Sequence, residues 1–145
     1  MASTPRPAHT RKSASGKLAQ IVRIGTHAIT SDEPAALGGD DLGPDPHELL
    51  DAALASCTAL TLTLYAQHKG LAIENLEVAV SHTEADGVYR IERTIHVEGA
   101  LTDAQRARLL EIANRCPVHR TLSGRFEIAS ELEPGSIDAH PDSSS

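Results

Sequence analysis

The two cysteines of the chain are the residues whose surroundings point most directly to a chemistry. Cys57 lies in an almost uncharged segment, HELLDAALASCTALTLTLYAQHKG, and Cys116 ends a second amphipathic segment. Neither cysteine belongs to a CxxC motif or adjoins a His-rich run, so the spacing does not indicate a structural zinc site. One thiol among apolar residues and one beside basic residues favour redox chemistry on sulfur.

Cys57 continues an apolar stripe at helical spacing, so it is expected to face packed aliphatic side chains. A free cysteine in such a place often serves as a small hydrophobic residue, and an apolar setting disfavours the thiolate. A reactive Cys57 would therefore need a nearby cation. The candidate is Arg93, which interrupts the apolar face of a predicted strand and could pair with Glu48 or with a Cys57 thiolate. The pattern alone slightly favours a plainer role, in which Arg93 turns to solvent at a bulge or pairs across a dimer interface.

Cys116 is better placed to form a thiolate. Pro117 suits the first turn of a short helix, and Arg115 and Arg120 lie on either side of the thiol in sequence. His119 follows three residues later, where it could act as a base toward Cys116. The plainer alternatives are that Cys116 only completes the apolar stripe of the preceding helix and that His119 only caps a helix end.

Two further histidines precede Cys57 in the chain. His27, in IGTHAIT, comes before a turn-rich loop, and His47 opens the apolar helix. Taken singly, each is expected to be structural, although either could approach Cys57 in the fold. A zinc site formed by Cys57, Cys116 and a histidine lacks the usual ligand spacing, so no metal and no other cofactor is expected.

Composition narrows the classes of function. The chain has 145 residues and a net charge of −7, which predicts one domain and argues against a general nucleic-acid role. The basic, polar start of the chain lacks the apolar core of a secretory signal. We therefore expect a cytoplasmic protein with reduced thiols, in which any disulfide would be transient. The longest uncharged stretch, residues 52–67, is shorter than the ~20 apolar residues that span a bilayer, so no membrane span is expected.

The composition also changes along the chain. Residues 1–15 are rich in Pro, Ser and Ala and are predicted to be a disordered arm, and residues 133–145 a flexible tail. The folded domain is predicted over residues 16–132. Alternation predicts a strand over 17–24, followed by a turn-rich loop over 31–46.

A long helix is predicted to follow that loop. Asp45 is a plausible N-cap, Pro46 suits the first turn, and Gly70 ends the helix. At ~1.5 Å per residue the helix is about 35 Å long, whereas the radius of gyration for this chain length is about 15 Å. Because the helix is apolar nearly all round, it should be buried on all sides. A second subunit is the simplest cover, so a homodimer is predicted.

The second half of the chain is predicted to form a hairpin, a helix and a strand. Asp86-Gly87 predicts the hairpin turn, and a capping box over Thr102–Gln105 opens the helix. A last strand is predicted over residues 125–132, with Phe126 inward. The resulting order predicts an α+β fold in which helices pack on an antiparallel sheet.

Three segments resemble the OsmC/Ohr family, the osmotically inducible protein C and organic hydroperoxide resistance proteins. They are GDDLGPDPHELLDAALASCTALTL, RIERTIHVEG and LLEIANRCPVHRTL, and the likeness covers residues 17–132. Details such as THAITSDEP are more similar to the YhfA-like branch. The resemblance implies an OsmC-like intertwined homodimer with two long central helices and an antiparallel sheet.

The resemblance also implies a thiol peroxidase that needs no metal or prosthetic group. Cys57 would attack the hydroperoxide and become a sulfenic acid, and Cys116 would condense with it to a disulfide. A cellular dithiol, such as a lipoyl group, would reduce that disulfide. An apolar pocket would favour organic hydroperoxides as substrates, and neither nucleic acid nor a membrane is implied as a partner.

Two positions depart from the peroxidase members of this family. Those proteins have a Glu directly after the Pro that opens the helix, where this chain has His47, with Glu48 next. They also bring an Arg from the N-terminal loop, which here contains His27 and no Arg. The Arg–Glu clamp is therefore not carried over, and our hypothesis is that Arg93 or His27 substitutes for it. The alternatives are a non-peroxidase of the same fold that binds an apolar or reactive small molecule between subunits, and a hydrolase or thiol transferase that depends on Cys116 and His119.

Overall fold

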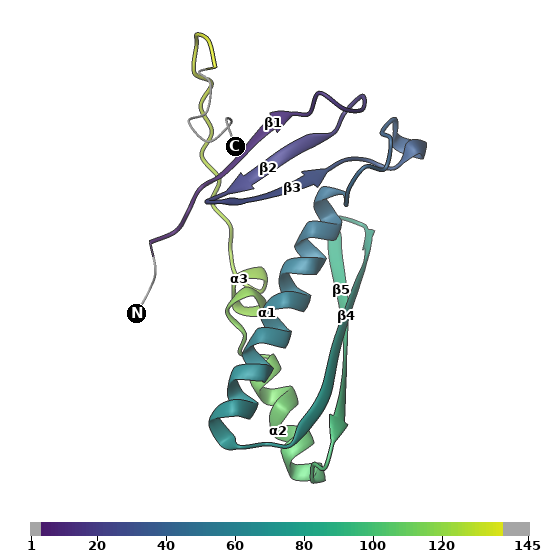
Figure 1. Ribbon diagram of the computed structural model, residues 1–145, viewed down its shortest axis with the longest axis vertical. Coiled ribbons are helices and arrows are strands. Elements are labelled where there is room, and N and C mark those ends of the chain that lie inside the picture. Colours follow the sequence, from purple (N-terminus) through teal and green to yellow (C-terminus); the bar gives the residue numbers. More distant parts are fainter. Residues whose placement is uncertain (1–3, 138–145) are drawn as a thin grey trace.

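The computed structural model describes residues 4–137, which form a three-stranded sheet above a body of helices and one long hairpin (Figure 1). The sheet consists of β1 (Ala8–Lys12), β2 (Gln20–Ile24) and β3 (His27–Ser31), which pair antiparallel in that order. A short 3₁₀ helix, η1 (Ala35–Leu37), follows in the loop that leads to α1. The strand predicted over residues 17–24 is present as β2 but begins at Gln20.

The prediction of a disordered arm over residues 1–15 is wrong for the part that the structure describes. Residues 8–12 form β1, which pairs with β2 along its whole length, from Ala8 opposite Ile24 to Lys12 opposite Gln20. Composition suggests disorder here because every β1 residue is exposed and polar or small. The strand forms because β2 offers a row of unpaired backbone groups that an adjacent strand can satisfy. Residues 1–3 and 138–145 lie outside the described residues.

Helix α1 (Pro46–Lys69) begins and ends as predicted. The Asp45 carboxylate accepts a hydrogen bond from the backbone N–H of Glu48, and the Glu48 side chain accepts one from the N–H of Asp45. This capping box satisfies N–H groups that have no partner within the helix. Gly70 ends α1 in the left-handed region, at φ 63°, where glycine carries no steric penalty.

The single chain leaves part of α1 uncovered, as expected for a helix that a second subunit would help to cover. Its buried residues form one stripe: Asp51, Leu54, Thr58, Leu62 and Ala66. On the opposite side, Leu60 and Leu64 are 62% and 64% exposed. Within the chain, the helix and strand neighbours of α1 are the hairpin, α2 and α3. Burial of the remaining face in a homodimer stays a prediction.

Among the described residues, α1 is the one helix that is long and apolar enough to cross a bilayer. Its mean hydropathy reaches 1.5 over the most apolar window, of which 28% is buried within the chain. Core helices of soluble proteins pass the same test. Length and composition are therefore weak evidence for a membrane span.

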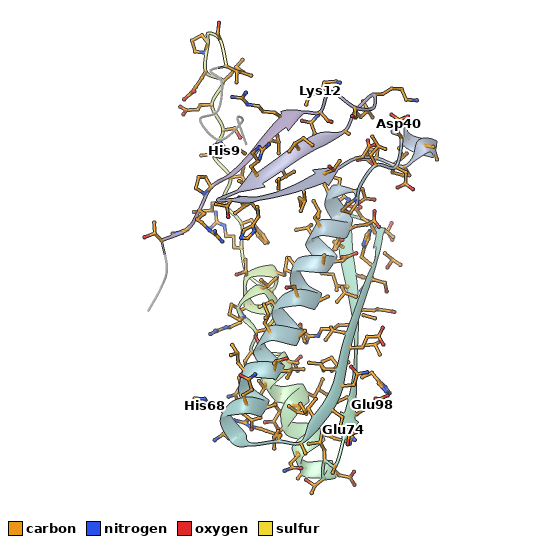
Figure 2. All side chains as sticks on the ribbon, viewed as in Figure 1. His9, Lys12, Asp40, His68, Glu74 and Glu98 are labelled. Atoms are coloured by element: carbon orange, nitrogen blue, oxygen red, sulfur yellow. The ribbon has the colours of Figure 1, made fainter. Side chains whose placement is uncertain are left out.

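Strands β4 (Ile73–Ala85) and β5 (Val88–Gly99) form the long hairpin beside α1. Asp86 and Gly87 both have positive φ, 54° and 74°, as a two-residue hairpin turn of this hand requires. Residues of β5 alternate between half-buried and exposed, and the half-buried face is the predicted one: Tyr89, Ile91, Arg93, Ile95 and Val97. Figure 2 shows the far end of this body, where Glu74 and Glu98 of the hairpin and His68 of α1 lie away from the three-stranded sheet.

Helices α2 (Asp103–Ala113) and α3 (Pro117–Leu122) cover α1 from another side. The capping box predicted over Thr102–Gln105 opens α2. Leu109 and Ala113 of α2 pack with Leu62 of α1 in the buried core, against half-buried side chains of the hairpin such as Ile95. These contacts hold the α2–α3 junction against the middle of α1.

The strand predicted over residues 125–132 is absent. This segment leaves α3 and runs past the three-stranded sheet as irregular chain (Figure 1), and Phe126 and Ile128 are 58% and 87% exposed. Alternation predicts a strand only where a neighbouring strand can complete its hydrogen bonds. The fold is thus α+β, as predicted, but with two separate small antiparallel sheets.

Candidate functional site

Cys116 lies at the junction of α2 and α3, where it is the N-cap residue of α3 and is fully buried. Its Sγ accepts a hydrogen bond from the backbone N–H of His119 at 3.3 Å. Sγ also lies 3.8 Å from Oγ1 of Thr58, in the middle of α1. The predicted helix start at Pro117 is confirmed, and His119 contacts the sulfur through its backbone.

Cys57 precedes Thr58 in α1 and is half-buried. Both cysteines are free thiols. Because Thr58 touches the sulfur of Cys116, the fold brings the α1 turn that carries Cys57 to the α2–α3 junction. The disulfide between Cys57 and Cys116 stays a prediction.

Arg93 lies on the inward face of β5 and reaches the same junction. Its guanidinium donates hydrogen bonds to Oγ1 of Thr58 at 3.1 Å, the carbonyl of Ala113 at 3.3 Å and Oδ1 of Asn114 at 2.8 Å. The role that the pattern favoured, a turn to solvent at a bulge, is therefore wrong. The register is regular at Arg93, opposite Val80, and the irregularity lies at Ile73. Three neutral oxygens, rather than Glu48 or Cys57, offset the cost of turning this cation inward.

A cavity of about 410 Å³ opens beside Arg93, between α1, β5 and the α2–α3 junction. Its lining combines apolar and polar side chains, and both β5 and α3 contribute side chains of each kind. The lining residues are Leu54, Tyr89, Ile91, Arg93, Leu110, Asn114, His119, Leu122 and Ser123. Such a cavity suits a small molecule with an apolar body and one or a few polar atoms.

The other predicted supporting residues are spread over the fold. Glu48 is exposed and engaged in the capping box of α1. His27 is exposed on β3, opposite Ile24, and the structure records no contact between it and Cys57. Arg120 is exposed, and its backbone N–H donates to the carbonyl of Cys116 at 3.1 Å.

Sequence reasoning missed a second polar cluster, between the start of α1 and the hairpin. Asp51, 8% exposed, accepts a hydrogen bond from the Tyr89 hydroxyl at 2.9 Å, and its other oxygen lies 2.5 Å from Nδ1 of His82. The His82 and Tyr89 rings stack with centroids 4.6 Å apart, and His47 packs at 5.3 Å from Tyr89. His47 thus contacts this cluster; no contact with Cys57 is recorded for it.

The cluster changes the acidity of Tyr89. Burial, followed by the hydrogen bond to Asp51, raises the pKa of Tyr89 to about 12, because both favour the neutral phenol. One signal in the sequence could have revealed the cluster. Asp51 is a carboxylate on the buried stripe of an otherwise apolar helix, and a buried carboxylate needs hydrogen-bond donors.

No group of three or more His, Cys, Asp or Glu side chains within residues 4–137 is arranged to hold a metal ion. The side chains described above offer two free thiols, a guanidinium beside the α2–α3 junction that carries Cys116 and a mixed cavity next to it.

Comparisons with known proteins agree with this fold. A model of the OsmC-like protein family matches residues 38–131, and no curated protein matches the chain. An OsmC-like protein from Mycoplasma pneumoniae has a similar structure, with a TM-score of 0.72 and 20% sequence identity over 85% of this chain and 90% of that one.

Two further solved structures are similar. An organic hydroperoxide resistance protein OsmC from Legionella pneumophila matches with a TM-score of 0.63 and 19% identity, over 86% of this chain and 93% of that one. The organic hydroperoxide resistance protein OhrB of Bacillus subtilis matches with a TM-score of 0.55 and 24% identity, over 83% and 92%. At these identities the likeness concerns the fold. With the family match over most of the folded part, the chain belongs to the OsmC-like protein family.

Proposed function

We propose that this protein reduces organic hydroperoxides to alcohols with its two thiols, as part of the defence against oxidative stress. The Cys57 thiolate would attack the hydroperoxide, break its O–O bond and become a sulfenic acid, and the alkoxide would take up a proton to give the alcohol. Cys116 would then condense with the sulfenic acid to a disulfide and release water. A dithiol, of the lipoyl kind or another, would reduce the disulfide and become oxidised itself.

The observation that carries this proposal is the contact between Thr58 and Cys116, 3.8 Å between Oγ1 and Sγ. Thr58 directly follows Cys57, so the α1 turn that carries Cys57 lies against the α2–α3 junction that carries Cys116, and we propose that the two thiols can meet there. A resolving cysteine has to lie close to the peroxidatic one, since a disulfide requires Cα atoms about 4.4–6.8 Å apart. Similar proteins named organic hydroperoxide resistance proteins add support.

The cavity of about 410 Å³ supports an organic substrate. Leu54 of α1 lies in its wall, one helical turn before Cys57, and Ile91, Leu110 and Leu122 add apolar surface. A hydroperoxide with an apolar group would gain from burial there, by about 25 cal/mol for each Å² of apolar surface removed from water. Hydrogen peroxide has no apolar group and would gain nothing from that wall.

The exposed face of α1 supports the homodimer. Leu50, Ala53, Cys57, Leu60 and Leu64 recur at alternating spacings of three and four residues, and Leu50, Leu60 and Leu64 are 43%, 62% and 64% exposed. This repeat is typical of a helix seam that packs against a second helix. A second copy of α1 is its proposed partner, which would also cover the half-buried Cys57. We further propose a cytoplasmic location, and neither nucleic acid nor a membrane as a partner.

One observation favours a second candidate function. The recorded hydrogen bonds of the Arg93 guanidinium go to three neutral oxygens. Among the hydrogen bonds and ion pairs recorded for residues 4–137, none joins a charged group to the Cys57 thiol. A thiol without a neighbouring cation reacts slowly with peroxides. The alternative is a catalytically weak protein of this fold that binds an apolar or reactive small molecule at the dimer interface.

Thiol counting by mass spectrometry distinguishes the two functions. The wild type and Cys57→Ser are each treated with one equivalent of an organic hydroperoxide, and free thiols and disulfides are then quantified. Rapid loss of two thiols and a Cys57–Cys116 disulfide in the wild type, both absent in the variant, would support the peroxidase. If both thiols survive the oxidant, the peroxidase proposal is wrong, and ligand binding at the dimer interface becomes the better candidate.

A further inference from the structure

Thr58 lies where α1 meets the α2–α3 junction, one residue after Cys57 and in contact with Cys116. It is fully buried, and its hydroxyl oxygen has three neighbours: the carbonyl of Leu54 at 2.7 Å, the guanidinium of Arg93 at 3.1 Å and Sγ of Cys116 at 3.8 Å. A threonine at this place in a helix commonly bonds the carbonyl four residues back. The contacts with Arg93 and Cys116 require a further explanation.

The protons at Thr58 can be accounted for one by one. A guanidinium only donates, so the Thr58 oxygen accepts from Arg93, and the single hydroxyl proton is left for one other neighbour. While Cys116 is a neutral thiol, that proton goes to the carbonyl of Leu54 and the thiol can donate to the oxygen. If Cys116 becomes a thiolate, the hydroxyl can rotate and donate to the sulfur. The Leu54 carbonyl loses little, because it lies within α1 and also takes the helical N–H.

Arg93 strengthens this arrangement. Its positive charge draws electron density from the Thr58 oxygen and so makes the hydroxyl a better donor. The Ala113 carbonyl and Asn114 hold the guanidinium from the α2 side, which keeps Arg93 at the junction. The groups that face Cys116 from the other elements are thus neutral Thr58 from α1, with cationic Arg93 of β5 behind it, while His119 of α3 donates its backbone N–H to the sulfur.

We propose that Thr58, held by Arg93, is a positioning residue that stabilises the Cys116 thiolate and thereby makes Cys116 the leaving group when the disulfide is reduced. This inference rests on the proposed function for the existence of that disulfide. The reductant's thiolate would attack Sγ of Cys57, the S–S bond would break, and its electron pair would go to Sγ of Cys116. A second thiol of the reductant would then displace Cys57, so that the dithiol is oxidised by the two electrons that the protein takes up.

Access to the two sulfurs supports the same direction. Cys116 is 0% exposed, so an incoming thiol is kept from its sulfur by the chain itself, whether or not a second subunit packs beside Cys57. The sulfur that leaves better is also the one whose thiolate is better stabilised. The structure thus assigns attack to Cys57 and departure to Cys116.

The first test measures the thiolate of Cys116 alone, in a Cys57→Ser background, by its ultraviolet absorbance at one fixed pH where the thiol is only partly ionised. Thr58→Val removes the hydroxyl and should lower the ratio of thiolate to thiol about tenfold, since a hydrogen bond to a charged group is worth at least that factor. Thr58→Ser should restore the original ratio. Thr63→Val is the matched control, because Thr63 is an exposed threonine of the same helix. An unchanged ratio in Thr58→Val would overturn the inference, whether or not the protein is a peroxidase.

The second test follows the disulfide itself, formed with diamide so that it does not depend on peroxidase activity. A monothiol, 2-mercaptoethanol, is added, the reaction is quenched with acid, and mass spectrometry locates the mixed disulfide. The inference expects the adduct on Cys57 in the wild type and reduction about threefold slower in Thr58→Val, taking a Brønsted coefficient of about 0.5 for the leaving thiolate. An adduct mainly on Cys116 would overturn it. If Thr58→Val does not fold, Thr58→Ala removes the same hydroxyl and replaces it in both tests.

Discussion

We expect the hydrogen bond between Tyr89 and Asp51 to contribute measurably to the free energy of unfolding. Tyr89→Phe removes the hydroxyl that donates to the Asp51 carboxylate at 2.9 Å and leaves His82 as the remaining partner of that carboxylate. A hydrogen bond to a charged group contributes about 1.5–3 kcal/mol. Because His82 stays, we expect Tyr89→Phe to lower the free energy of unfolding by about 1–2 kcal/mol.

The effect of pH follows from the raised pKa of Tyr89, which is about 12 in the folded protein against an ordinary value of 10.0. Between these two values the unfolded chain releases the phenolic proton and the folded protein keeps it. Stability therefore falls as pH rises wherever the folded state binds more protons. The stabilisation from Tyr89 should be fully present below pH 10 and decrease as pH rises toward 12, whereas Tyr89→Phe should lack this loss.

Urea unfolding of the wild type and of Tyr89→Phe, from neutral pH to the alkaline limit of reversibility, measures both effects. Tyr65→Phe is a comparison variant that loses a different hydrogen bond, because the Tyr65 side chain interacts with Arg108 and lies near the opposite end of α1, fourteen positions from Asp51, or about 21 Å along the helix. Equal stability of Tyr89→Phe and the wild type at neutral pH would refute the reasoning. So would a difference between them that does not shrink above pH 10.

Three other predictions concern the thiols and the exposed helix face. Cys116→Ser should stop the cycle at the Cys57 sulfenic acid, because no second thiol remains to condense with it, and dimedone labelling followed by mass spectrometry would detect that species. Arg93→Ala, made separately in Cys57→Ser and Cys116→Ser backgrounds, should change the thiolate absorbance of Cys116 at a fixed pH more than that of Cys57, since Arg93 contacts Thr58 beside Cys116; a larger change at Cys57 would contradict this geometry. Leu60→Glu should convert the proposed dimer to monomers in light scattering, because it places a charge in the exposed seam of α1. The control Leu37→Glu, at a residue that is 67% exposed on η1, should leave the mass unchanged, and a dimeric Leu60→Glu would argue against α1 as the interface.

Local sequence patterns predicted the ends of the regular elements well. The N-cap at Asp45, the capping box at Thr102, the stop at Gly70 and the turn at Asp86-Gly87 all occur as expected. Each of these features forms between residues within about four positions of one another, so a short stretch of sequence is enough to predict it. The alternating face of β5 was predictable for the same reason.

Patterns that depend on a distant neighbour failed. Residues 8–12 became a strand because β2 lies beside them, and residues 125–132 did not because no strand of the described chain pairs with them. The apolar composition of α1 predicted burial on all sides with a second subunit as part of the cover. The chain itself buries one stripe of α1 and leaves Leu60 and Leu64 exposed, and the homodimer stays a prediction.

The sequence by itself determined which residues could do chemistry: two thiols without a metal-binding pattern, one in an apolar helix and one beside Pro117. Tertiary structure alone decided what surrounds them. Thr58 and Cys116 are 58 positions apart, and Thr58 and Arg93 are 35 apart, so no local pattern could reveal their contacts. The same holds for Asp51 with His82 and Tyr89. A buried polar group must find a partner, but which partner it finds depends on how helices and strands pack.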